Sequence, residues 1–293
     1  MELKTHLEIT PVEARGGRWW KREDYNRNDY GVNGSKYRVC RHLLEGAMAA
    51  GYDHVVSASA TASPQSSICA TLAEELGMKC TIVVGASKPE TAIKHPNIAI
   101  AMAAGADLDT GCRVAYNGTL QPYGARLAQE LGAYQLPYAI SPPASSSLED
   151  VEAFLRVNAP QVSNLPDGIE RLVLPFGSAN TACGIFYGLH DQRPASLTDI
   201  YLMEIGPDRR QWARDRLESV GRSLELPGVN IHFITLHEIW ASYSEQMPET
   251  LDGIVFHPWY EGKMIRWLQL TRPTWWNLRD GTTCFWIVGG PVG

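Results

Sequence analysis

The sequence lacks any apolar run long enough to cross a membrane. Its longest apolar stretches, such as residues 98–104, fall far short of the roughly 20 residues that a membrane-spanning helix needs. Residues 1–15 carry charges where a secretory signal peptide would be apolar. We therefore expect a soluble, cytoplasmic protein with no membrane among its partners.

Closely spaced cysteines are also missing. The six cysteines form no C-x-x-C pair and have no histidine nearby in the sequence, so they indicate neither a zinc site nor a disulfide framework. We expect reduced, partly buried thiols and no metal. The cysteines are Cys40, Cys69, Cys80, Cys112, Cys183 and Cys284.

The chain has no excess of positive charge. Its 32 acidic residues outnumber its 26 basic residues, and the net charge of −6 provides no overall attraction to nucleic acid or to a membrane surface. Two nucleotide-binding signatures are absent as well, the G-x-x-x-x-G-K-[ST] loop and the G-x-G-x-x-G turn. Binding of a nucleoside triphosphate or of NAD is therefore disfavoured.

What the sequence does contain is a regular alternation of strand and helix patterns. This alternation predicts parallel sheets with helical crossovers, which is an α/β fold. The length of 293 residues and the hydrophobic content of 44% allow one large domain or two ordinary ones. Predicted strands include 54–60, 79–85, 171–176, 200–205 and 282–288, and predicted helices include 39–50, 64–76, 89–105, 148–158, 181–189 and 262–270.

The serine- and proline-rich stretch 141–147 is the clearest linker. We expect a smaller α/β domain, residues 45–160, inserted into a larger domain made of residues 1–44 and 161–293. Pro11 and the pair Gly16-Gly17 suggest that residues 1–20 form an irregular arm. The charged run 21–24 that follows is typical of a solvated turn.

Three segments carry candidate chemistry. Lys36 stands in a glycine- and asparagine-bearing loop before a predicted helix, where it is either a surface charge or an amine held close to a ligand. The strand 171–176 runs directly into residues 177–181 and then into a helix, which aims backbone N–H groups at one point and suits a phosphate. A plain strand-to-helix turn has the same pattern. The third segment, 257–263, places Glu261 after a predicted strand.

A phosphate site, a loop lysine and a carboxylate after a strand are together the set that pyridoxal phosphate chemistry needs. The lysine amine condenses with the cofactor aldehyde as a Schiff base. A carboxylate beside the pyridine nitrogen keeps that nitrogen protonated and electron-withdrawing. We therefore predict pyridoxal 5'-phosphate as the cofactor.

On these segments and three more, the chain resembles the fold type II pyridoxal-phosphate enzymes, and among them the 1-aminocyclopropane-1-carboxylate deaminase and D-cysteine desulfhydrase family. Residues 21–24 match the family's K-R-E-D, residues 33–38 are similar to G-N-K-x-R, and residues 257–263 are close to D-P-x-Y-x-G-K. Residues 64–67 resemble its Q-S-N segment, and residues 287–290 stand where it has H-T-G-G. The resemblance implies a tryptophan synthase β-like fold with two three-layer α/β domains and mostly parallel sheets.

The resemblance also implies roles for individual residues. Lys36 would be the Schiff-base lysine, and Glu261 the partner of the pyridine nitrogen. The catalytic candidates are Lys36, Ser66 and Tyr260, and the substrate-binding candidates are Gln65, Ser66 and Tyr260. The cofactor-binding candidates are Lys36, Ser67, Gly177, Ser178, Ala179, Asn180, Thr181 and Glu261. Structural alternatives remain, namely a helix cap for Ser66, a charge at a helix N-terminus for Glu261 and a packed ring for Tyr260.

Several positions depart from the family's motifs. Ser67 replaces an asparagine, Val39 replaces a basic residue after the lysine loop, and His257 replaces an aspartate. Ile287 and Val288 replace the terminal His-Thr pair. This pattern suggests a changed substrate, and His257 itself is interpreted as a structural histidine outside the catalytic set.

The leading hypothesis is a lyase- or deaminase-type enzyme that acts at the α-carbon of an amino-acid substrate through an external aldimine, by elimination, deamination or decarboxylation. The resemblance implies a homodimer. A non-catalytic carrier of the cofactor is an alternative hypothesis.

A further hypothesis is a bacteriophage enzyme of DNA hypermodification that acts, for example by decarboxylation, on an amino acid attached to a thymine-derived base. Nucleic acid would then be a partner only as substrate. The altered substrate motifs fit such a conjugate, and the run 272–279 interleaves basic and aromatic residues that could stack on bases. A hydrophobic corner or a subunit contact is the plainer explanation of that run.

Overall fold

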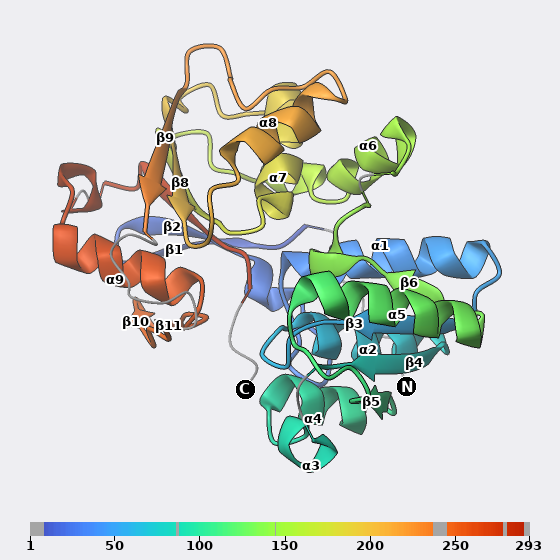
Figure 1. Ribbon diagram of the computed structural model, residues 1–293. Coiled ribbons are helices and arrows are strands. Elements are labelled where there is room, and N and C mark those ends of the chain that lie inside the picture. The colour runs from blue at the N-terminus through green and yellow to red at the C-terminus, as the bar shows by residue number, and fades with distance from the viewer. Residues whose placement is uncertain (1–8, 86–87, 144, 237–244, 278–279, 290–293) are drawn as a thin grey trace. The chain divides into compact units, whose positions relative to one another are not determined.

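The computed structural model describes residues 9–85, 88–143, 145–236, 245–277 and 280–289. The chain divides into two compact units, and most of their helices and strands are labelled in Figure 1. Unit 1 combines the described residues up to Asn26 with those from Ser146 to Gly289, and unit 2 runs from Arg27 to Ser145. Each unit contains a mostly or wholly parallel sheet. The predicted α/β architecture is therefore confirmed.

The main sheet of unit 1 has six strands in the order β1-β2-β12-β7-β8-β9. The first pair is antiparallel and every other neighbouring pair is parallel. The strands are β1 (Val12–Arg15), β2 (Arg18–Arg22), β12 (Thr283–Ile287), β7 (Arg171–Phe176), β8 (Asp199–Glu204) and β9 (Asn230–Thr235). A two-stranded ribbon, β10 (Thr250–Leu251) with β11 (Ile254–Val255), forms a separate small sheet.

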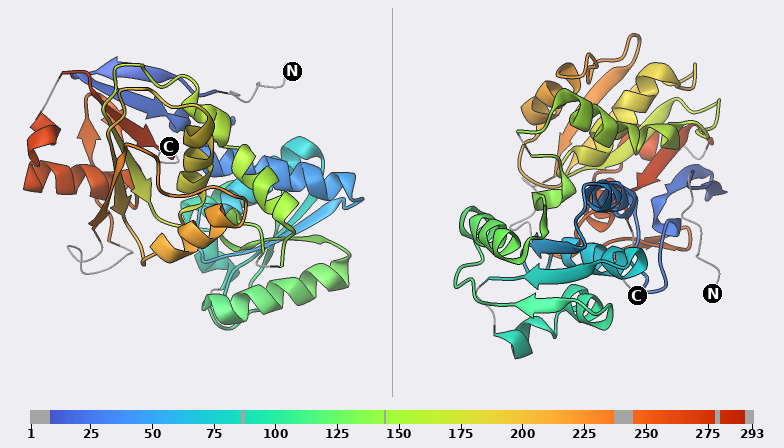
Figure 2. Two further views of the ribbon diagram at one scale, coloured as in Figure 1. Left: turned by 90° about the horizontal axis from the view of Figure 1, so that it is seen from above. Right: turned by 90° about the vertical axis from the view of Figure 1, so that its right-hand side faces the viewer.

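Helices cover both faces of the unit 1 sheet, as the two views of Figure 2 show. On one face, α9 (Glu261–Thr271) contributes Met264, Ile265 and Leu268 to a buried cluster with Trp20 and Phe285 of the sheet. The other face carries α7 (Asn180–Asp191), which packs against α6 (Leu148–Arg156) and α8 (Arg210–Glu218). Short 3-10 turns complete the unit, η1 (Glu23–Tyr25), η3 (Ala159–Val162) and η4 (Thr274–Asn277).

Unit 2 contains a four-stranded parallel sheet in the order β5-β4-β3-β6. Its strands are β3 (His54–Ala58), β4 (Lys79–Val83), β5 (Asp107–Asp109) and β6 (Tyr134–Leu136). Its helices are α1 (Ser35–Ala49), α2 (Gln65–Leu76), α3 (Pro89–Ala92), α4 (Pro96–Ala103) and α5 (Asn117–Leu131), with the 3-10 turn η2 (Tyr138–Ile140).

Side chains of β3 alternate between the two faces of this sheet. Val56 and Ala58 share a buried cluster with Leu120 of α5, whereas Ser57 accepts a hydrogen bond from Gln65 of α2. The helix α2 in turn packs against α1 and α4. The sheet therefore has helices on both faces, which gives the predicted three layers.

The sequence predicts an irregular N-terminal arm, but the structure shows a regular hairpin there. Strands β1 and β2 form a hairpin whose turn, Gly16 and Gly17, has φ angles of 58° and 76°. Glycine adopts such positive φ angles without steric cost, and two of them in succession give the turn that matches the twist of a hairpin. The charged run that follows is not solvated either, because Lys21, Arg22 and Glu23 are buried.

Other boundaries also differ from the expectation. The helix expected over 89–105 is split into α3 and α4, because Pro96 holds His95 in an extended conformation and starts a new helix.

The compact units divide after residues 26 and 145, whereas domain borders were expected after 44 and 160. The reason is packing, since α1 contacts α2 and α6 contacts α7.

The described helices include none that is both long and apolar enough to span a membrane. All six cysteines are buried free thiols. Within the described ranges there is no cluster of three or more His, Cys, Asp or Glu side chains that could hold a metal ion.

Candidate active site

Several of the predicted site residues of unit 1 lie at one edge of its sheet. Strands β12 and β7 are parallel neighbours, so their carboxyl ends reach the same edge. Gly177 follows β7, and Val288 and Gly289 follow β12. In open α/β sheets, ligands bind outside this edge, where loops leave the strands.

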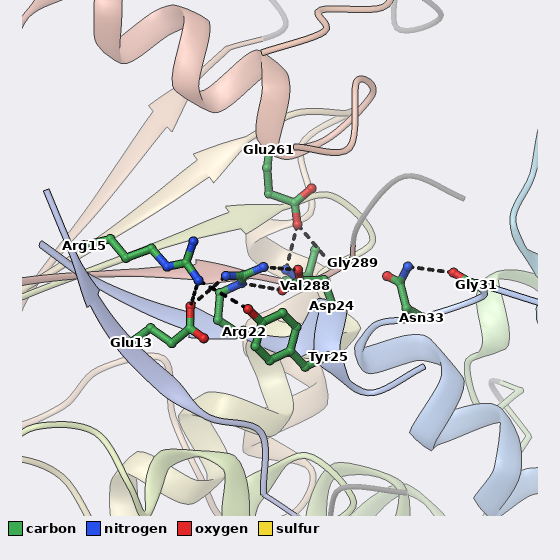
Figure 3. Close-up of polar contacts among 10 residues, drawn as sticks. All are labelled: Glu13, Arg15, Arg22, Asp24, Tyr25, Gly31, Asn33, Glu261, Val288 and Gly289. Atoms are coloured by element: carbon green, nitrogen blue, oxygen red, sulfur yellow. Dashed lines mark hydrogen bonds and ion pairs between the residues drawn. The ribbon is translucent and has the colours of Figure 1, made fainter. Parts of the chain in front are cut away.

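Glu261 is bound to this edge by its side chain. It is the first residue of α9 and is fully buried. Its Oε1 accepts hydrogen bonds from the backbone N–H groups of Val288 at 2.7 Å and Gly289 at 3.1 Å (Figure 3). Its Oε2 is also buried and has no hydrogen-bond partner among the residues that the structure describes. A buried carboxylate oxygen without a donor is costly, so this atom is suited to an N–H donor from a ligand.

The pKa of Glu261 also indicates that its side chain is suited to a cationic donor from a ligand. Burial raises the pKa of Glu261 from 4.5 to about 8. Hydrogen bonds from the backbone N–H groups of Glu261 itself, Gly289 and Val288 oppose the rise, and the charge of Asp24 adds to it. Without a ligand the carboxyl group is therefore largely protonated at neutral pH. A cationic donor at Oε2 would restore the carboxylate, because an opposite charge within hydrogen-bond distance favours the ionised form.

The loop between β7 and α7 has the conformation that its small residues allow. Gly177 and Ser178 are partly exposed, and Ala179 takes a left-handed φ of 66° before the helix begins at Asn180. The amino end of α7 is thus presented at the carboxyl edge of the sheet. Its N–H groups and its positive dipole end suit a phosphate, as predicted for residues 177–181.

The segment before α9 brings Tyr260 to this loop. A Cβ atom placed on Gly177 would lie 3.8 Å from Cε1 of Tyr260, so the glycine loop and this phenol ring are neighbours. Gly262 belongs to the same motif, and sterics explain why this position is a glycine. A Cβ atom there would lie 2.0 Å from the carbonyl oxygen of Met247. Sequence reasoning had identified Tyr260 and Glu261 together, and the structure places both beside residues that follow the central strands.

A network of charges fixes the strand end beside this site (Figure 3). Arg22, the last residue of β2, donates to both carboxylate oxygens of Asp24, at 2.9 and 2.6 Å, and to Glu13 at 2.8 Å. Its guanidinium lies 4.1 Å from the ring centre of Tyr25. Arg15 forms a second ion pair with Glu13 at 2.8 Å. The K-R-E-D motif is therefore a structural element with internal partners.

Lys21 of the same motif is also structural. Its Nζ donates to the carbonyl oxygen of Thr10 at 2.8 Å and to Oδ1 of Asn164 at 2.7 Å. The backbone N–H of Thr10 donates to Oε1 of Gln161 at 3.0 Å. This buried lysine ties the N-terminal hairpin to the segment after α6.

In unit 2, Lys36 is the second residue of α1 and is partly exposed. The helix starts after Gly34, whose φ of 99° is accessible mainly to glycine. The loop before it is shaped by side-chain hydrogen bonds, since Oδ1 of Asn28 accepts from the N–H groups of Tyr30 and Val32. Lys36 thus extends from a structured turn at a helix N-terminus.

The start of α2 carries the other predicted residues of unit 2, and all three are buried. Ser66 shares a hydrogen bond of 2.9 Å with the hydroxyl of Ser59. The hydroxyl of Ser67 lies 3.0 Å from both Oδ1 of Asn97 and the carbonyl oxygen of Pro64. Sequence reasoning had missed Ser59 and Asn97, and only the polar loop 57–63 hinted at the first.

Gln65 is engaged within unit 2. Its Nε2 donates to Ser57 at 3.2 Å and to the carbonyl oxygen of Pro137 at 3.4 Å, and its Oε1 accepts from the N–H of Ala139 at 2.9 Å. The amide group therefore holds the start of α2 against the segment after β6.

The paired tryptophans of η4 pack into unit 1. Trp276 is buried, and its ring meets that of Phe285 edge-on at 5.5 Å, with the guanidinium of Arg18 at 4.1 Å. The ring of Trp275 stacks on Tyr201 at 4.3 Å. For these two rings the hydrophobic corner is the better explanation.

Residues 278 and 279 of the run 272–279, like Gly290 of the terminal motif 287–290, lie outside the described residues.

No protein-family model matches the chain. Among curated proteins, it is 28% identical to the O-seryl-dTMP PLP-dependent decarboxylase of Salmonella phage ViI, over 92% of this chain and 77% of that protein. It is 26% identical to a 1-aminocyclopropane-1-carboxylate deaminase of Rhizobium radiobacter, over 92% of this chain and 87% of that protein.

Solved structures share the fold. One is described as a homologue of ACC deaminase, with a TM-score of 0.70, 19% identity, and coverage of 98% of this chain and 91% of that chain. Another is O-ureido-L-serine synthase, with a TM-score of 0.60, 15% identity, and coverage of 97% and 89%. These likenesses confirm the predicted fold class and the predicted resemblance.

Proposed function

We propose that this chain, which has the type II fold of pyridoxal-phosphate enzymes and PLP-dependent relatives, removes the α-carboxylate from an amino acid attached to a thymidylate-type nucleotide. When bound, the cofactor supplies an electron sink for the bond that breaks at the α-carbon. The prediction of a PLP-dependent enzyme is confirmed at the level of this class by its relatives. The reaction and the substrate are the proposal.

The observation that carries the cofactor assignment is the buried Oε2 of Glu261, which has no donor among the described residues. A protonated pyridine nitrogen is the cationic N–H donor that this atom requires. A carboxylate in this position keeps the nitrogen protonated, and a protonated ring withdraws electrons more strongly than one paired with a neutral hydroxyl. Glu261 therefore favours reactions that place a negative charge on the α-carbon, decarboxylation among them.

Other residues would hold the cofactor and move protons. We assign the phosphate to residues 177–181, where the N-terminus of α7 supplies N–H groups. Lys36 would hold the cofactor through its ε-amino group and return a proton to the α-carbon once released. Ser66 and Tyr260 remain the candidates for a second acid or base. The start of α2, Gln65 to Ser67, is proposed for the substrate carboxylate and the cofactor ring.

The nucleotide-borne substrate is supported by the relative from Salmonella phage ViI, whose name specifies decarboxylation of O-seryl-dTMP. It also agrees with the altered substrate motifs. The polar His-Thr pair of the deaminase motif is replaced by Ile287 and Val288, and the aspartate of D-P-x-Y is replaced by His257. The acidic net charge of −6 fits a single nucleotide better than a long DNA duplex.

The test is mass analysis of products from the cofactor-loaded chain. It is incubated with O-seryl-dTMP, with free serine and with 1-aminocyclopropane-1-carboxylate. We expect loss of carbon dioxide from the nucleotide conjugate and much slower reaction of the two free amino acids. An unchanged conjugate would contradict the proposal.

A deaminase is the second candidate, because two relatives are 1-aminocyclopropane-1-carboxylate deaminases at 26% and 25% identity. The same incubation separates the candidates. Ammonia and a keto acid released from 1-aminocyclopropane-1-carboxylate would favour deamination.

We also propose a homodimer, as the resemblance implies, and a cytoplasmic location. Six buried free thiols agree with a reducing compartment. Sedimentation equilibrium of the cofactor-loaded chain tests the dimer, and a single species with the mass of one chain would contradict it.

A further inference from the structure

Three aromatic side chains, those of His257, Trp259 and Tyr260, come from the segment between β11 and α9. The rings of His257 and Tyr260 lie 4.8 Å apart and those of His257 and Trp259 lie 5.6 Å apart. All three residues are partly exposed. Tyr260 immediately precedes Glu261, and a Cβ atom placed on Gly177 would lie 3.8 Å from Cε1 of its ring.

We propose that His257, Trp259 and Tyr260 form a subsite that binds the pyrimidine base of the substrate, an inference that rests on the proposed function. The bases of nucleotides bind to proteins by stacking on aromatic faces. An aromatic group beside both Glu261 and the phosphate loop is in a position to hold the base while the attached amino acid reaches the reacting site.

The buried aromatic residues of unit 1 show why this group differs from ordinary packing. Trp20 and Phe285 are fully buried and stack at 4.9 Å in the core, and Trp276 is almost fully buried against them. The rings of His257, Trp259 and Tyr260, in contrast, are partly exposed, and they precede Glu261, whose side chain binds the edge of the sheet where ligands bind. Tyr260 touches the core cluster only as a partly buried neighbour.

His257 adds a difference in charge. The related motif has an aspartate here, and a carboxylate would repel the phosphate of a nucleotide. The backbone N–H of Trp259 donates to Nδ1 of His257 at 3.3 Å. When the ring is neutral, its hydrogen is therefore on Nε2, and the side chain carries no negative charge.

The experiment measures binding of dTMP, which lacks the amino acid, to the cofactor-loaded chain by calorimetry. Trp259→Leu removes the aromatic face and Trp259→Phe keeps one, so the second variant is the matched control. We expect Kd to rise by about tenfold or more for Trp259→Leu and for His257→Asp, because stacking on an aromatic ring contributes on the order of 1–3 kcal/mol per base. Trp259→Phe should change Kd by less than about threefold.

Unchanged dTMP binding in Trp259→Leu and His257→Asp would overturn the inference. Visible absorbance of the bound cofactor and the thermal midpoint establish that each variant is folded. If the variants do not fold, dTMP and 2-deoxyribose 5-phosphate are compared on the native chain. Binding that is stronger with the base supports the subsite, and equal binding overturns it.

The two proposals fail differently. Turnover of O-seryl-dTMP together with base-independent binding would overturn the subsite and leave the proposed function standing. Base-dependent binding of dTMP without any loss of carbon dioxide from the conjugate would overturn the proposed reaction and leave the subsite standing.

Discussion

Unit 1 buries ionisable groups in two different ways. At the end of β2, Arg22 is surrounded by Asp24, Glu13 and the ring of Tyr25. All three nitrogen atoms of its guanidinium group donate hydrogen bonds to these two carboxylates. At the neighbouring end of β12, Glu261 binds two backbone N–H groups with one oxygen and leaves the other without a donor among the described residues. The first arrangement stabilises the fold by itself, whereas the second is complete only with a ligand. Variants of the two kinds should therefore separate stability from cofactor binding.

The largest effect is expected from Lys36→Ala. Because the ε-amino group would hold the cofactor, the variant should lose the visible absorbance of bound pyridoxal phosphate completely after dialysis. Lys36 is partly exposed, so the free energy of unfolding of the cofactor-free protein should change by less than about 1 kcal/mol. Absorbance spectra and urea unfolding are the measurements, and absorbance equal to that of the native chain would remove Lys36 from the site.

Arg22→Ala tests the other side of the comparison. The change leaves Asp24 and Glu13 without their guanidinium partner, and we expect the free energy of unfolding to fall by about 3 kcal/mol. Arg15→Ala is the matched control in the same network. Its side chain is 36% exposed, so its loss should cost less than about 1 kcal/mol. If the free energy of unfolding fell equally in the two variants, burial of Arg22 would not strengthen its contribution to stability.

The stability of the cofactor-free protein should also depend on pH. Burial raises the pKa of Glu261 from 4.5 to about 8, so the folded protein without cofactor binds more protons than the unfolded chain between these values. Its stability should therefore be highest below the lower value, fall as pH rises through this window, and no longer change above about 8 on account of this group. Glu261→Gln should remove this contribution. Thermal midpoints of both proteins across the window measure it, and identical profiles would show that Glu261 does not titrate there.

The sequence predicted those parts of the site that depend on local order along the chain. A strand that runs into Gly177 and then a helix, and a carboxylate at the first turn of α9, are visible as composition and spacing. The hairpin of β1 and β2 was missed, although Gly16-Gly17 is a turn signal, because the flanking charges resembled a solvated segment. Burial of Lys21 in that segment depends on a residue far away in the sequence, because Oδ1 of Asn164 accepts its hydrogen bond.

The same reason explains the other omissions. Asn97 lies 30 positions after Ser67, and nothing in the local sequence links the two. Oε2 of Glu261, which has no hydrogen-bond partner in the described part of the chain, could not be foreseen either, because its surroundings depend on how β12 and α9 pack together. Motif resemblance supplied the role of Glu261, and packing supplied the physical reason for it.

We infer that Glu261 is protonated in the cofactor-free protein and becomes a carboxylate when the cofactor's pyridine nitrogen binds to it. Infrared difference spectra at neutral pH, recorded before and after addition of pyridoxal phosphate and compared with Glu261→Gln, measure this directly. We predict that a protonated carboxyl band disappears on cofactor binding and is absent from the variant throughout. A band that persists in the loaded native protein, or a difference spectrum that Glu261→Gln leaves unchanged, would contradict the account.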